Sequence, residues 1–144
     1  MKHRVLAEGE LRTIVAVFDI GDEIIEGMTD LVRAEEVTAA SLTAVGAVRE
    51  ATLGWYDLDA QEYRHIPVQE QAEVLSLLGD VAVGPDGKPA VHAHAVLGLR
   101  DGSTRGGHLL SGIVRPTLEV ALTESPARLA KTYRPELGLS LIDL

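Results

Sequence analysis

Short apolar runs separated by turn-forming residues are the feature that most constrains the fold of this chain. From residue 40 onward, six stretches have the composition of extended strands, at 40–48, 51–58, 62–69, 73–83, 90–99 and 107–123. Gly84-Pro85-Asp86-Gly87 and Asp101-Gly102 supply the turn residues that short antiparallel connections need. This pattern predicts a meander of strands and lacks the strand–helix alternation of a parallel sheet.

One long stretch has helical periodicity. Ile24, Met28 and Leu31 recur at a spacing that places them on one helix face, in a helix expected from an Asp22 cap to about residue 36. Residues 4–8 and 12–20 predict a hairpin before it, and residues 126–133 predict a short second helix before a final strand at 137–142. We therefore expect an α+β fold with a central, mainly antiparallel sheet, one main amphipathic helix and a short second helix.

Length and composition narrow the class of protein. The 144 residues are expected to form one domain, 1–144, and the absence of cysteine excludes disulfides, thiolate zinc sites and iron–sulfur clusters. No apolar run is long enough for a membrane helix, and the first ten residues contain no apolar export segment, so we expect a cytoplasmic protein. A net charge of −9 with scattered basic residues opposes direct binding to DNA.

Three histidines form the strongest local signal for chemistry. His92 and His94 lie at positions i and i+2, so on a strand both point to one face, about 6.6 Å apart. A turn at Asp101-Gly102 would bring His108, which follows two glycines, beside them. Three imidazoles with an open fourth position suit a divalent metal, zinc before nickel, cobalt or copper. The alternative is a half-exposed pair of strand histidines and a third one after a bulge.

Two acidic residues lie within apolar strand patterns. Glu73 shares a predicted face with Leu75 and Leu77, where it could orient a ligand or carry a proton as a catalytic group. Glu119 is a weaker candidate of the same kind. The alternative for Glu73 is a solvated position at the end of a strand.

Several of these segments together resemble the plant and prokaryote conserved (PPC) domain family. The resemblance rests on His92-Ala93-His94, on Gly106-Gly107-His108-Leu109 and on the segment that continues to Val120. The small-residue run 41–48 and the acid-led run 73–79 also match, so that the resemblance spans about residues 5–143.

The resemblance implies an α+β fold, a homotrimer and a metal bound by His92, His94 and His108 near a subunit interface. It leaves the small-molecule ligand and any reaction open. The alternative is a DNA-associated or partner-binding regulatory module without catalysis. However, the Arg-Pro steps at residues 115 and 134 lack the basic DNA-binding hook of plant members, and residues 70–72 lack their Gly-Arg-Phe partner contact.

Overall fold

The structure, a computed structural model, describes residues 1–7 and 12–144, with the backbone alone for residues 3–7. Its elements in chain order are β1 (Lys2–Ala7), β2 (Thr13–Phe18), α1 (Ile24–Ala34), β3 (Ala39–Asp57), β4 (Glu62–Val68), β5 (Ala72–Val83), β6 (Pro89–Gly98), β7 (Thr104–Glu124), β8 (Ala130–Arg134) and β9 (Leu139–Asp143). The β1–β2 hairpin is the predicted one, although its connection, including Gly9, lies outside the described residues.

The strands of the described residues form one sheet in the order β1-β2-β7-β3-β5-β8-β9, with β4 beside β3. β6 pairs with both β5 and β7, and β3 also pairs with both, so these four strands close a ring. All pairings are antiparallel except the single parallel bridge between β5 and β8. The predicted, mainly antiparallel sheet is therefore confirmed. The predicted meander is wrong, because β7 lies between β2 and β3 in the sheet. The stretches expected at 40–48 and 51–58 form one continuous strand, β3.

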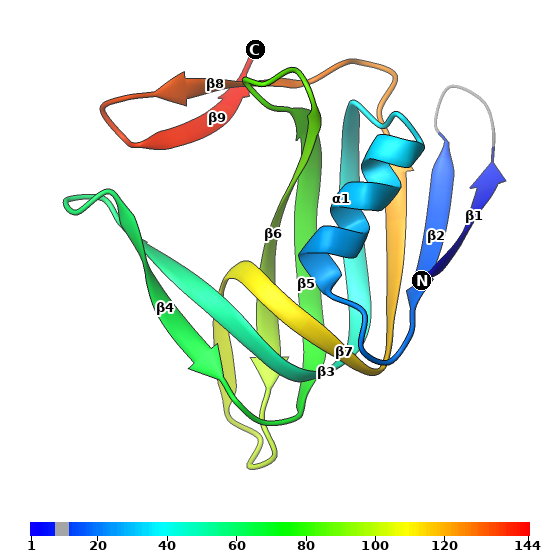
Figure 1. Ribbon diagram of the computed structural model, residues 1–144, viewed down its shortest axis with the longest axis vertical. Coiled ribbons are helices and arrows are strands. Elements are labelled where there is room, and N and C mark those ends of the chain that lie inside the picture. The colour runs from blue at the N-terminus through cyan, green and yellow to red at the C-terminus, as the bar shows by residue number, and fades with distance from the viewer. Residues whose placement is uncertain (8–11) are drawn as a thin grey trace.

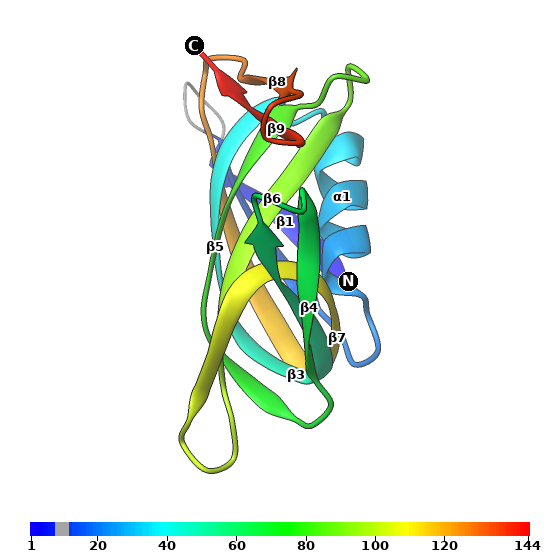
Figure 2. The same ribbon diagram turned by 90° about the vertical axis from the view of Figure 1, so that its left-hand side faces the viewer.

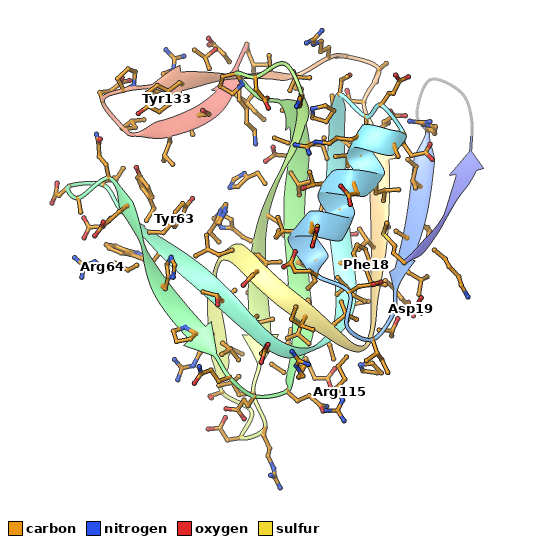
Figure 3. All side chains as sticks on the ribbon, viewed as in Figure 1. Phe18, Asp19, Tyr63, Arg64, Arg115 and Tyr133 are labelled. Carbon is orange, nitrogen blue, oxygen red and sulfur yellow. The ribbon has the colours of Figure 1, made fainter. Side chains whose placement is uncertain are left out.

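Helix α1 covers one side of this sheet (Figures 1 and 2). Its apolar face, which consists of Ile24, Met28, Leu31 and Val32, is buried against the sheet. Phe18 of β2 is fully buried beside it, and its ring lies where a side chain at Gly27 would be (Figure 3). The core thus lies between α1 and the strands that close the ring.

The expected cap of α1 is displaced by one residue. Glu23, not Asp22, is the N-cap, and its carboxylate accepts from the backbone N–H of Glu26 at 2.7 Å. The other Glu23 oxygen accepts from Gly112 N at 2.8 Å, so this longer side chain caps the helix and also fixes it to β7.

The expected second helix at residues 126–133 is wrong. This segment is an irregular connection followed by β8, which pairs with β9 in a C-terminal hairpin. Eight residues make a marginal helix without a buried face. Here Leu129 O instead accepts a hydrogen bond from Val83 N, and Leu129 N donates one to Thr38 O. α1, at 11 residues, is the one helix in the described chain, and it is too short to cross a membrane.

Candidate metal centre

The ring of strands brings the three predicted histidines together. His92 and His94 point to the same face of β6, while Ala93 and Ala95 between and after them are buried in the core. His94 lies directly opposite His108 of β7. The ring centroids are 5.0 Å apart for His92 and His94, 5.2 Å for His92 and His108, and 5.4 Å for His94 and His108. The predicted proximity is therefore confirmed.

The donor atoms fit one metal ion. One nitrogen from each histidine lies within 4.8 Å of the others. Tetrahedral zinc with Zn–N bonds of about 2.0–2.1 Å separates its ligand nitrogens by about 3.4 Å, which small side-chain rotations reach. His108 Nδ1 is buried, and no group of the described residues hydrogen-bonds it. A buried ring nitrogen without a hydrogen-bond partner costs free energy, and a metal ion bound to an unprotonated Nδ1 would remove this cost.

Burial keeps two of these histidines neutral. The pKa of His108 is lowered from 6.5 to about 4, first by burial and then by the neighbouring charges of His92, His94 and Lys131. Burial is also the main cause that lowers the pKa of His94, and His92 adds to it while Asp80 opposes it. Because only an unprotonated imidazole nitrogen binds a metal, both side chains are in the binding state at neutral pH.

Behind His92, Asp80 of β5 and Lys131 of β8 form a charged pair. Asp80 Oδ2 lies 2.9 Å from His92 Nδ1, and Asp80 Oδ1 lies 3.1 Å from Lys131 Nζ. Burial alone would raise the pKa of Asp80, but the contacts with His92 and Lys131 outweigh it and lower the pKa. The carboxylate is therefore ionised at neutral pH and accepts the Nδ1–H of His92.

Tyr63 of β4 covers the other side of the site. Its ring centroid lies 4.8 Å from that of His108, and Figure 3 shows it extending from β4 toward the interior of the molecule. Gly54 makes room for this ring, because a Cβ there would lie 2.7 Å from Tyr63 Cδ1. Burial, with a smaller effect of Tyr56, raises the pKa of Tyr63, so its hydroxyl remains protonated at neutral pH.

Within one copy of the chain, the two acidic candidates, Glu73 and Glu119, lie away from the three histidines. Glu73 is exposed at the start of β5, opposite Gly98 and seven residues from Asp80. A bulge between Val74 and Ser76 shifts the alternation, so Leu77 is buried and does not share the face of Glu73 as expected. Glu119 is exposed among apolar side chains on the face of the sheet opposite α1. The structure brings neither carboxylate to the histidines within one copy.

Sequence reasoning missed Asp80, Lys131 and Tyr63. Asp80 could have been found by the argument used for Glu73, because it is a carboxylate within an apolar run, Leu77-Leu78-Gly79-Asp80-Val81. Lys131 could not be found in this way, because the sequence predicts a helix at residues 126–133.

The lowered pKa of His108 predicts that metal-free protein loses stability in acid. Between pH 6.5 and about 4 the unfolded chain binds more protons at His108 than the folded chain does, so the free energy of unfolding falls as pH drops through this window. At about 1.4 kcal/mol per pKa unit, the loss from His108 is at most about 3 kcal/mol. Urea unfolding of metal-free protein from pH 7 to 4.5 measures it.

His108→Asn should flatten this pH dependence, and His65→Asn, at an exposed strand position, is the matched control. If the pH dependence of the free energy of unfolding were unchanged in His108→Asn, the lowered pKa of His108 would be contradicted.

Comparisons with known proteins agree with this geometry. The family model of the Plants and Prokaryotes Conserved (PCC) domain matches residues 6–126. No curated protein sequence matches the chain. A crystal structure of a plant- and prokaryote-conserved (PPC) protein from Pyrococcus horikoshii is similar, with 28% identity, a TM-score of 0.86 and coverage of 96% of this chain and 98% of that one.

Two further solved structures are similar over nearly their whole length. A metal-containing protein from Archaeoglobus fulgidus has 30% identity and a TM-score of 0.84, with 99% of this chain and 97% of that one covered. A protein from Bacteroides thetaiotaomicron, described as a candidate for DNA binding, has 25% identity and a TM-score of 0.87, with 98% and 96% covered. From the family match, the ring of strands and the histidine cluster together, we conclude that this chain belongs to the plant and prokaryote conserved domain family.

Proposed function

We propose that this chain is a single-domain metal-binding protein in which His92, His94 and His108 hold one divalent ion, with zinc as the first choice. The observation that carries the proposal is the convergence of three imidazole nitrogens within 4.8 Å, one from a histidine whose buried Nδ1 is unpaired in the described structure. The metal-containing relative from Archaeoglobus fulgidus supports it. The cytoplasmic location expected from the sequence stays a prediction.

Bound there, zinc would keep a fourth position for water or a ligand and would lower the pKa of that water toward about 7. This chain's residues contribute three imidazoles, the Asp80 carboxylate behind His92 and the Tyr63 ring against His108. Their arrangement supports hydrolysis or hydration as well as binding without turnover. A proton-carrying role for Glu73 remains part of the proposal only if a neighbouring copy brings it to the site.

We further propose that the chain assembles as a homotrimer and that the metal site lies near the subunit interface. Val45, Leu75 and Leu78 are 57%, 55% and 58% exposed and line one groove on the sheet face away from α1. In Figure 2 this is the side of the sheet opposite the helix. Leu78 also lies directly opposite His94, so the apolar groove and the histidines are adjacent. A second copy that covered the groove would border the metal.

A regulatory module associated with DNA is the second candidate, favoured by the description of the relative from Bacteroides thetaiotaomicron. The net charge of −9 argues against it, because binding to duplex DNA depends on cationic side chains that release counterions.

Loss of any one histidine should remove the metal. With two imidazoles left, zinc content should fall from about one ion per chain to near zero in His92→Ala, His94→Ala and His108→Ala, because stable zinc sites use three or more protein ligands. Elemental analysis and calorimetric titration of untagged protein measure this. His65→Ala, which removes an exposed histidine, should keep wild-type zinc. Wild-type zinc content in His92→Ala or His108→Ala would rule out the site.

A charge in the apolar groove should dissociate the trimer. Leu75→Glu would place a carboxylate where the proposed interface excludes water, so light scattering at micromolar concentration should give a monomer mass. Leu58→Glu is the matched control, since Leu58 is 61% exposed in the turn after β3, away from the groove. A monomeric wild-type protein, or a trimeric Leu75→Glu variant, would contradict the proposed interface.

Duplex DNA should not bind to the isolated protein at physiological salt. Fluorescence anisotropy in about 150 mM salt should show no submicromolar affinity, because the net charge is −9 and the basic residues are scattered along the sequence. Submicromolar binding that weakens steeply with added salt would favour the regulatory module instead.

A further inference from the structure

The contact between Asp80 and His92 is built into the pairing of β5 with β6. The two residues are direct cross-strand partners, so their side chains leave the sheet on the same face, about 5 Å apart at Cβ. Asp80 Oδ2 and His92 Nδ1 are 2.9 Å apart. Gly79 permits this close approach, because a Cβ there would lie 2.3 Å from the backbone oxygen of His92. The backbones of β5 and β6 are therefore in close contact next to the Asp80–His92 pair.

This contact determines which nitrogen of neutral His92 faces the histidine cluster. An ionised carboxylate only accepts hydrogen bonds, so in the neutral imidazole it selects the tautomer of His92 that carries its proton on Nδ1. In that tautomer Nε2 carries no proton and is turned away from Asp80. Among the described carboxylates, Asp80 is the one that contacts any of the three histidines.

Lys131 fixes the other oxygen of Asp80. Its side chain is only 10% exposed, and it comes from the C-terminal hairpin, beyond the residues 6–126 that the family model matches. The other end of this hairpin is fixed as well, because the Tyr56 hydroxyl donates to Leu137 O at 2.7 Å. The Asp80 carboxylate is therefore held between the His92 ring at Oδ2 and the Lys131 ammonium, an ion-pair partner, at Oδ1. Figure 1 shows the hairpin extending from the end of β5 toward the β3–β4 turn.

We infer that Asp80 is the positioning residue of the metal site: it holds His92 as the Nδ1–H tautomer with Nε2 directed to the ion, and Lys131 of the C-terminal hairpin keeps Asp80 in place. This inference rests on the proposed metal site and adds a residue that acts through a ligand. Second-layer carboxylates of this kind typically contribute about 10–100-fold to metal affinity.

Three variants separate positioning from charge. Asp80→Ala removes both the acceptor and the charge, and zinc affinity measured by chelator competition should fall about 10–100-fold. Asp80→Asn keeps an acceptor oxygen without the charge, so its affinity should lie between those of Asp80→Ala and the wild type. Asp30→Ala, which removes an exposed carboxylate on α1, is the charge-matched control and should bind zinc like the wild type.

Nitrogen-15 NMR of the imidazoles in metal-free protein tests the tautomer directly. His92 should carry its proton on Nδ1 in the wild type and in Asp80→Asn, and on Nε2, the form favoured in water, in Asp80→Ala. Equal zinc affinity in Asp80→Ala and the wild type, or equal losses in Asp80→Asn and Asp80→Ala, would overturn the positioning role. A wild-type protein that binds no zinc but shows the Asp80-dependent tautomer would instead refute the proposed function and leave the contact standing.

Discussion

The antiparallel pairing of β3 with β7 holds the rest of the structure together. β3 is 19 residues long and β7 is 21, and they pair from Ala40 opposite Glu124 to Gly54 opposite His108. β5 adds to the other edge of β3, and β6 then joins β5 to β7. Because the ring is closed, β5, β6 and β7 cannot move apart independently. The metal ligands and Asp80 all belong to these three strands, so the backbone of the site is fixed before any ion binds.

Local sequence patterns could predict the strands but not the details that depend on distant partners. The turn residues and apolar alternation placed most strand ends within a few residues, and the His-x-His spacing predicted the shared face of His92 and His94. The bulge near Leu75 was not predictable, because it arises from the pairing of β5 with two neighbours. The C-terminal hairpin replaced a predicted helix because β9 offered β8 a partner, which helical spacing alone does not reveal.

The electrostatics of the site combine neutral and charged groups in separate positions. Burial keeps His108 and His94 unprotonated, which prepares their nitrogens for a cation. The carboxylate of Asp80 stays ionised on the far side of His92, where Lys131 balances its charge. With a divalent ion added, the net charge of this cluster would be +2, since Asp80 and Lys131 cancel. Such a cluster favours an anion or a deprotonated water at the remaining position on the metal.

The alternation along β6 also affects how the chain folds. Ala93 and Ala95 are 1% and 3% exposed, whereas His92 and His94 point to the opposite face. A slip of one residue during assembly would turn both imidazoles into the apolar core, at a cost of about 1–3 kcal/mol for each unpaired polar group, and would expose the alanines. The two histidines therefore discriminate against a mispaired β6 in the newly made chain. Replacing both with apolar residues would remove that discrimination and favour kinetic trapping during refolding, even where the final fold is unchanged.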